Sequence, residues 1–371
     1  MLRPDPTTPS FNLLYHGSEL ELSKEQVAVI KDFCLKNLKE VNFKNALKPK
    51  DKGVATSDFA TMLWYFLRKF NFVYPEEVLL DMLSFDWIEG NQYVGIDYLE
   101  SKLSPEKIRE RILDNFNKGI KVGEVLKNHI NYCKKHNFIK ARDQLSNIIK
   151  DSKIKIENRL LALETVANFS DSTTFLEEML DIDELELFIK SAEILMTRGN
   201  NKSKQKLLLK LSSEDEKFAL ESAKLLIREQ NLKAICYYSD YIKRTKKFEV
   251  DFYDRNPLQE TKTIKALPVL IELLEFSYKY RKEIQQSEFD TLDNMVISIL
   301  KNISLQDFSN FNKVVKALKK FIQKHQAQFD GINFLNTVCD DIEKAFFINY
   351  TSKITVDEAI EKIERNTGFY E

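Results

Sequence analysis

The sequence predicts an all-α fold, an α-solenoid of HEAT-like helical hairpins wound into a right-handed superhelix. A repeat carries this prediction, because residues 191–195 (SAEIL) return at 222–226 (SAKLL), with a looser version at 161–165 (LALET). A spacing of about 30 residues is typical of stacked helical hairpins. A small residue at such a position lets two helices pack closely while Leu and Ile fill the seam. The alanines of the three copies are Ala162, Ala192 and Ala223.

Composition supports helix over most of the chain. Of 371 residues, only 9 are Gly and 8 are Pro, while 30% are charged and 43% are hydrophobic. So few helix breakers, with an apolar fraction large enough for a packed interior, exclude disorder and disfavour a sheet-rich fold. The formal net charge is −1. No overall field therefore draws the protein to nucleic acid or to an anionic membrane.

Four segments are expected. Residues 1–20 form an N-terminal tail or linker, because Pro4, Pro6 and Pro9 interrupt any helix there. Residues 21–247 form an N-terminal block of helical repeats, and residues 265–371 form a C-terminal block. Residues 248–264 are an irregular connection between them, since 248–252 (FEVDF) alternates apolar and acidic residues in a strand-like way and Pro257 follows.

Helix starts are marked by capping residues. Ser23 and Gln26 form a reciprocal N-terminal cap. Pro75 suits a first helical position, with acidic residues following near the positive end of the helix dipole. Ser104-Pro105 opens a helix with Ile108 and Ile112 inward. Further helices are expected at residues 59–70, 122–135, 139–150, 267–278, 289–303, 314–324 and 332–347, in the repeats of 157–244, and after a cap at 355–358.

Cysteine usage and hydropathy predict a cytoplasmic protein without membrane partners. The cysteines Cys34, Cys133, Cys236 and Cys339 are far apart and form no CxxC pair, which suits a reducing compartment. The proline-rich start is not a secretory signal. No stretch reaches the roughly 18 uninterrupted apolar residues of a membrane span.

His129, Cys133 and His136 fall on one helical face, and their side chains are of the types that bind zinc. A structural zinc site needs a fourth ligand, and no other Cys or His lies nearby in sequence. A buried thiol and a histidine near a helix end explain the same residues. The favoured interpretation is therefore structural, with no metal.

The candidate partner-binding residues are Tyr237, Tyr238, Tyr241 and Arg244. Aromatic side chains next to cations anchor protein interfaces, and they also stack on bases and neutralise phosphates. The plainer interpretation is a helix with tyrosines in its seam and a solvated cationic end. A second basic stretch, residues 313–324, is interpreted as a helix whose lysines lie on its solvent-exposed side.

Nothing in the sequence indicates an enzyme or a cofactor. The acidic run Glu177, Glu178, Asp181, Asp183, Glu184 and Glu186 has no glycine turn of the calcium-binding kind, so it reads as a solvated face. The phosphate-binding loop GxxxxGK[ST] and the motifs GxGxxG, HExxH and GxSxG are all missing. Catalytic, cofactor-binding and metal residues are therefore predicted to be none.

Several stretches together resemble a known family. They are residues 41–47 (VNFKNAL), 74–86 (YPEEVLLDMLSFD), 95–99 (GIDYL), 122–130 (VGEVLKNHI), 266–274 (ALPVLIELL) and 302–304 (NIS). Their order resembles the helical-repeat region that follows the ATPase module in bacterial NACHT-type STAND proteins. Those are signal-transducing NTPases, many of them implicated in defence against phage. The resemblance spans most of residues 43–360 and rests on packing patterns.

The resemblance implies a non-catalytic sensor that binds a macromolecular trigger, in the first place a protein, beside a neighbouring NTPase module. The ATPase motifs themselves are absent, so the chain is either the C-terminal piece of a longer protein or a stand-alone relative. Two other classes stay open. One is an intracellular protein-interaction scaffold, and the other is a HEAT-like nucleic-acid binder similar to alkylation-repair glycosylases, which the near-neutral charge disfavours.

Overall fold

The computed structural model describes residues 23–29, 32, 76–83, 96–119, 123–248, 256–284, 291–329 and 331–351. Helices dominate these ranges and no strand occurs in them, which confirms the all-α prediction. The chain divides into two compact units, Met1–Ile194 and Leu195–Glu371, and each is described by itself. The predicted tail, the helix at 59–70 and the cap at 355–358 lie outside the described residues. The predicted division at 248–264 stays a prediction.

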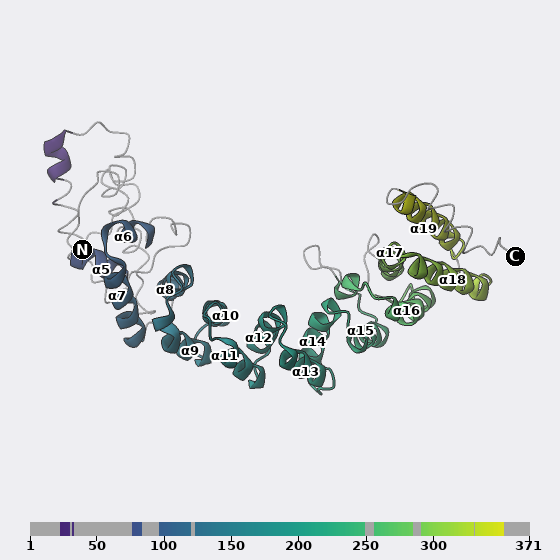
Figure 1. Cartoon of the computed structure of the whole chain (residues 1–371), viewed down its shortest axis with the longest axis horizontal. Coiled ribbons are helices and arrows are strands. Elements are labelled where there is room, and N and C mark those ends of the chain that lie inside the picture. The colour runs from purple at the N-terminus through teal and green to yellow at the C-terminus, as the bar shows by residue number, and fades with distance from the viewer. Residues whose placement is uncertain are drawn as a thin grey trace. The chain divides into compact units, whose positions relative to one another are not determined.

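The first unit is built of helices that pack on their neighbours in sequence. In Figure 1, α8 and α10 lie along one side, and α9 and α11 lie along the other. Both α8 and α9 contact α10, and α7 contacts α9. The elements are α5 (Glu76–Met82), α6 (Ile96–Lys102), α7 (Pro105–Asn117), α8 (Gly123–Lys135), η1 (Ile139–Ala141), α9 (Arg142–Lys150), α10 (Ile156–Ala167), α11 (Thr173–Glu178), η2 (Met179–Asp181) and α12 (Leu185–Thr197), which crosses into the second unit.

The second unit continues in the same manner. Contacts join α13 to α14, α14 to α15, α16 to α17, α17 to α18 and α18 to α19. Figure 1 shows α17 and α19 on one side of this unit and α16 and α18 on the other. Its elements are α13 (Asn201–Lys210), α14 (Glu216–Arg228), α15 (Leu232–Thr245), η3 (Pro257–Glu260), η4 (Ile264–Ala266), α16 (Leu267–Lys279), α17 (Leu292–Ser304), α18 (Phe308–His325) and α19 (Phe334–Thr351).

The repeated alanines lie in the buried interior of the helical packing. Ala162, Ala192 and Ala223 all have no exposed surface. The serines that precede two of them, Ser191 and Ser222, are equally buried. Small side chains such as Ala and Ser let a neighbouring helix backbone come near, and the flanking leucines can then fill the remaining space on either side. The sequence repeat therefore marks packing positions, as predicted.

Two predicted helix starts are confirmed in detail. The backbone N–H of Ser23 donates to Gln26 Oε1 at 2.9 Å, and the N–H of Gln26 donates to Ser23 Oγ at 3.3 Å. Ser104 Oγ accepts from the N–H of Lys107 at the start of α7. Ile108 and Ile112 in that helix are fully buried, as their spacing predicts.

Three turns between helices share one geometry. A carbonyl near the helix end accepts from the N–H five residues on, at Cys133 to Phe138, Leu195 to Asn200 and Leu226 to Asn231, each at 3.0 Å. The residue before the donor has a positive φ in every case, supplied by Asn137, Gly199 and Gln230. This is the Schellman end of a helix. Asn200 and Asn231 then cap the following helix with their side chains.

Some boundaries differ from the predicted ones. The helix predicted at 314–324 begins at Phe308, because Asp307 accepts from the N–H of Asn310 at 2.7 Å and caps it. The buried Phe311 extends its apolar face by another turn. The inward residues Val314, Leu318 and Phe321 are buried as predicted. Within 248–264, Pro257–Glu260 form the 3₁₀ turn η3, and Phe248 is buried.

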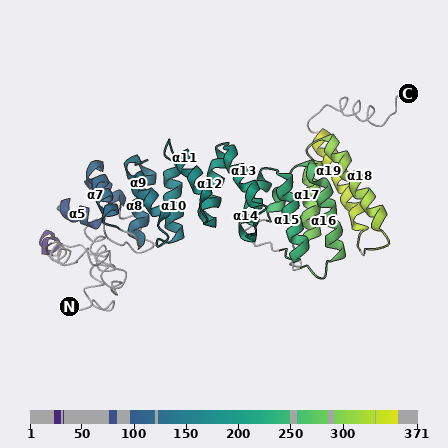
Figure 2. The same ribbon diagram turned by 90° about the horizontal axis from the view of Figure 1, so that it is seen from below.

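The alternation of helix direction changes once in the second unit. Arg244, near the end of α15, pairs with Glu216 at the start of α14, so these two helices are antiparallel. Lys246, just past the end of α15, pairs with Glu283, just past the end of α16. The last turns of α15 and α16 are therefore adjacent, and the two helices run in the same direction, side by side in Figures 1 and 2.

We predict that replacing Ala223 with Leu lowers the free energy of unfolding by about 1–3 kcal/mol, since the added atoms have no space at a fully buried helix crossing. Urea denaturation of the whole chain measures the change. Ala327→Leu is the control, because Ala327 is exposed, and its effect should stay within about 0.5 kcal/mol. Equal effects at the two positions would contradict the packing role of the repeated alanine.

Candidate partner-binding surface

The candidate residues Tyr237, Tyr241 and Arg244 share one side of α15. Asn231 caps this helix, and an adjoining side buries Ile235, Tyr238 and Ile242 in the core of the second unit, with Ala234 buried at the boundary between the two sides. Tyr237 and Tyr241 are half-buried, and the side chain of Arg244 is 63% exposed. We call these three residues the α15 surface. Half-buried tyrosines offer a large, rigid contact area with a polar tip.

Tyr238 has a different place from the other three predicted residues. It is only 8% exposed and belongs to the core. Its ring centroid lies 6.0 Å from that of Tyr241. Tyr238 therefore packs in the core beside the ring of Tyr241, and it is left out of the α15 surface. The sequence did not separate these roles, because adjacent tyrosines point to different sides of a helix only once its core side is known.

The cation of the α15 surface is already paired within the protein. Arg244 Nη2 donates to Glu216 Oε1, and the guanidinium carbon lies 5.8 Å from the ring centroid of Tyr241. Partial burial raises the pKa of Tyr237, and the nearby carboxylate of Glu216 raises it further. The hydroxyl of Tyr237 thus stays protonated and can donate a hydrogen bond to a partner.

Two neighbouring lysines, Lys243 and Lys246, are also paired with carboxylates. Lys243 Nζ lies 3.2 Å from Glu272 Oε2 of α16. Lys246 pairs with Glu283, and its ammonium lies 4.8 Å from the ring centroid of Tyr280. A phosphate at this end of α15 would have to displace these carboxylates. The arrangement therefore favours a protein partner over a nucleic acid, because nucleic-acid affinity comes mainly from unpaired cations that meet phosphates.

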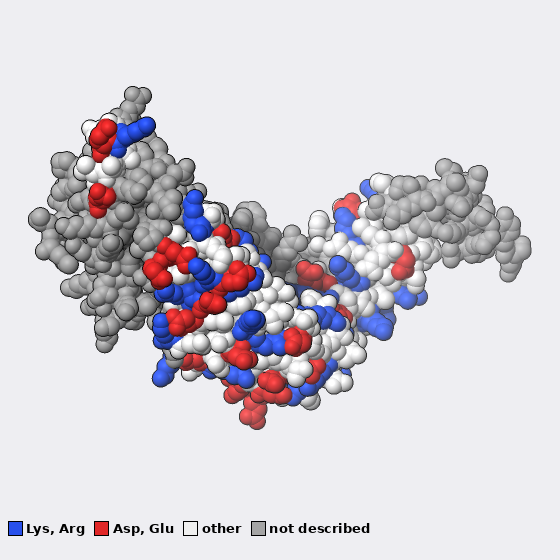
Figure 3. Space-filling model, turned by 60° about the vertical axis from the view of Figure 1, so that its left-hand side comes forward, with Lys and Arg blue, Asp and Glu red and all other residues white. Residues whose placement is uncertain are grey.

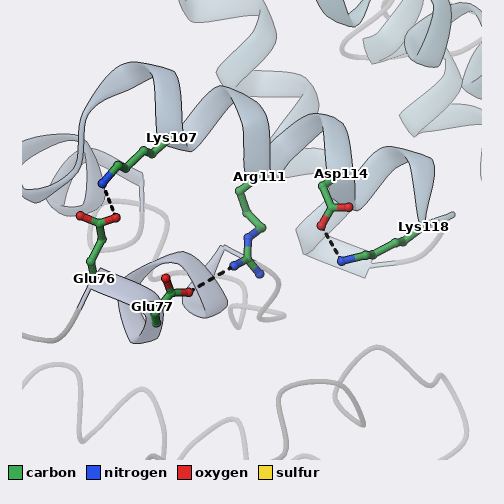
Figure 4. Close-up of polar contacts among 6 residues, drawn as sticks. All are labelled: Glu76, Glu77, Lys107, Arg111, Asp114 and Lys118. Carbon is green, nitrogen blue, oxygen red and sulfur yellow. Dashed lines mark hydrogen bonds and ion pairs between the residues drawn. The ribbon is translucent and has the colours of Figure 1, made fainter.

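Mixed charge extends over other parts of the surface. On the face in Figure 3, Lys and Arg alternate with Asp and Glu over the described residues. Pairs between successive layers produce this pattern in the first unit. Lys107 Nζ of α7 lies 2.5 Å from Glu76 Oε1 of α5, and Arg111 reaches Glu77 at 4.0 Å (Figure 4). Exposed pairs of this kind add little stability each. They remove any large field of one sign.

His129, Cys133 and His136 do not converge on one point. The Nε2 atom of the buried His129 lies 2.9 Å from Asn115 Nδ2. Burial raises the pKa of the Cys133 thiol to about 12, so this group stays protonated and is a poor metal ligand. His136 Nε2 lies 2.5 Å from Glu100 Oε1. The two histidines thus each contact a different side chain, and Cys133 is a buried thiol. No group of three metal-ligating side chains occurs among the described residues.

The acidic run contains one residue that sequence reasoning assigned to the wrong role. Glu184 was expected on a solvated face, but its carboxylate accepts from both terminal nitrogens of Arg159, at 2.5 and 2.6 Å. The side chain of Arg159 is only 5% exposed, and its Nε donates to the carbonyl of Ile149 at 2.7 Å. This guanidinium therefore ties the end of α9 and the start of α12 to α10. Glu178 pairs with Lys150 at 3.8 Å.

Two polar groups were missed from the sequence. Arg159 lies in α10 just before the apolar run Leu160–Leu163, and Glu216 lies at the start of α14. A basic residue that falls on the inward side of a helical period, as Arg159 does between Ile156 and Leu163, is a signal for a buried pair. It does not identify the partner, because Glu184 is 25 residues away.

Comparison with known proteins gives no relative. No protein-family model matches the chain, and no curated protein matches it. Among the described residues, no helix combines the length and the apolar character needed to cross a bilayer. The functional argument therefore rests on the residues and their contacts.

We predict that Arg159→Ala lowers the free energy of unfolding by about 3 kcal/mol or more, because it leaves the Ile149 carbonyl and the Glu184 carboxylate without their donor. Thermal and urea unfolding measure the loss. Lys107→Ala breaks a half-exposed pair, so its cost should be at most about 1 kcal/mol. A loss from Arg159→Ala no larger than that of the control would show that the buried contact is unimportant.

The buried His129 makes stability depend on pH. Burial lowers its pKa from 6.5 to about 4, so between these values the unfolded chain takes up a proton that the folded chain excludes. The free energy of unfolding should therefore fall as the pH drops from 6.5 to 4, by roughly 3 kcal/mol from this group. His129→Gln should flatten this part of the pH profile, whereas His136→Gln should keep it. A profile unchanged by His129→Gln would refute the assignment.

Proposed function

We propose that the chain is a non-catalytic recognition region: an α-solenoid of HEAT-like hairpins in a right-handed superhelix that binds a protein trigger. The observation that supports this most directly is the α15 surface. It combines two half-buried tyrosines with an arginine whose charge is balanced by Glu216. Tyr and Arg are the residues most enriched at the energetic centres of protein interfaces. A surface of balanced charge suits a protein better than a polyanion.

The proposed mechanism follows from packing between neighbouring helices. In each unit, helices contact mainly the elements next to them in sequence. A partner that spans several layers can therefore change the curvature of the stack through small adjustments at each seam. Binding energy then favours one curvature over another, which is how a sensor passes a signal to an adjacent module.

The proposed setting is a STAND-type signalling or anti-phage defence protein, in which a neighbouring NTPase module receives the signal. This setting comes from the family resemblance of the packing patterns. The second candidate is a stand-alone protein-interaction scaffold, which the same α15 surface also supports. The native gene distinguishes the two, because a phosphate-binding loop encoded upstream in the same reading frame supports the sensor, and an in-frame stop codon there supports the scaffold.

The nucleic-acid alternative makes a separate prediction. A HEAT-like nucleic-acid binder would shift duplex DNA at low salt and lose it steeply as salt is added. Because the cations beside Tyr241 are paired with carboxylates, we expect no such shift. Fluorescence anisotropy with a labelled duplex measures it, and salt-sensitive binding at micromolar protein would favour the alternative.

For the protein partner, we predict that the triple variant Tyr237→Ala, Tyr241→Ala, Arg244→Ala folds normally and binds at least roughly 30-fold more weakly, as expected when central interface residues are removed. The partner is first identified by crosslinking in the native host, and its affinity for the purified chain is then measured. Lys233→Ala with Lys247→Ala is the control, since both are exposed residues of the same segment. Equal affinity of the wild type and the triple variant would remove the α15 surface from the proposal.

A further inference from the structure

Residues 256–266 occupy the position of a helix without forming one. They follow α15 and contain only the single turns η3 and η4. The η3 turn contacts both α14 and α17, so it lies against two helices of the same unit. The α-helices α13–α19 in the described part of this unit each have ten or more residues. Most peptide N–H and carbonyl groups of such a helix are hydrogen-bonded within the helix itself. A single turn cannot do so, and its peptide groups need other partners.

Gln230 supplies several of these partners. It follows the end of α14 and holds a φ of +59°, a conformation that costs energy for a residue with a side chain. Its Nε2 donates to the carbonyl of Glu260 at 2.7 Å. Its Oε1 accepts from the N–H groups of Lys262 at 2.5 Å and Thr263 at 3.0 Å. This one side chain thus makes hydrogen bonds to three backbone groups that a helix would otherwise have bonded within itself.

Gln306 acts on the same segment from the other side. It lies just past the end of α17, and its Nε2 donates to the carbonyl of Lys262 at 2.8 Å. Asn310 Nδ2 donates to its Oε1 at 3.3 Å, which orients the amide. The N–H and the carbonyl of Lys262 are therefore held by two glutamines, one from the end of α14 and one from the end of α17.

We propose that Gln230 and Gln306 form a conformational latch. It couples α13–α15 to α16–α19 through residues 256–266, which we call the crossover. While the latch is closed, residues 256–266 act as a rigid layer between α14 and α17. Local opening then spreads across the crossover, and α13–α15 and α16–α19 exchange with solvent together. When the latch is open, the two groups of helices become separate cooperative segments. The inference concerns the second unit alone and does not depend on the partner of the α15 surface.

The test is native-state hydrogen exchange on the full chain, followed by mass spectrometry. In the wild type, the slowest amides of α14 and α17 should show one common opening free energy. In the double variant Gln230→Gly, Gln306→Ala, they should separate, with exchange rates that differ by roughly tenfold or more, because several hydrogen bonds are lost. Glycine at position 230 relieves the positive φ, so separation cannot be attributed to backbone strain.

Gln205→Ala is the matched control, since this glutamine is exposed on α13, and it should leave the common opening intact. The single variant Gln230→Gly should give a smaller separation than the double variant. A wild type whose α14 and α17 amides already open independently would overturn the proposal. A double variant that still opens as one segment would overturn it as well. The wild-type experiment decides the matter even where the double variant does not fold.

Discussion

Close packing of small residues at helix crossings is the constraint on which the other features depend. Ala162, Ala192 and Ala223 are fully buried, and each permits a neighbouring helix to approach. The described helices also carry exposed residues, and these positions remain available for solvent or a partner. Ile235 and Ile242 hold one side of α15 in the core, and Tyr237 and Tyr241 lie on an adjoining side that is only partly covered.

Polar contacts complete the layers where helices alone cannot. Arg159 reaches across three elements to Ile149 and Glu184, and the two glutamines hold the peptide of Lys262. In both places a side chain satisfies backbone or charged groups that no helix satisfies. Apolar packing alone tolerates small shifts between helices. These polar contacts fix the relative position of the helices, because a shift would leave the buried polar groups unpaired.

The sequence was sufficient for the all-α class and for many local features. The capping residues Ser23 and Ser104 and the inward residues Ile108 and Ile112 follow from short-range rules, since capping and helical periodicity need only a few neighbouring residues. The repeat also extends beyond residues 191–195 and 222–226, because Gly199-Asn200 and Gln230-Asn231 recur at the same offset as the alanines. Extending the repeat would have located two turns.

The remaining features depend on contacts between residues distant in sequence. Glu184 read as solvated because its partner, Arg159, belongs to another helix. Tyr238 read as a contact residue because nothing local shows which side of α15 faces the core. The sequence predicted an irregular connection around residues 256–266. It could not show that Gln230 and Gln306 bind this segment, because both are distant from it in sequence. The solenoid, the sensor role and the family setting stay proposals.

Small-angle X-ray scattering of the purified chain tests the central claim most directly. A compact globular protein of this length has a radius of gyration of about 21 Å. If successive helix layers form an open stack with no common centre, the measured radius should be well above that value and the pair-distance distribution should have a long tail. A radius near 21 Å with a symmetric distribution would contradict the account.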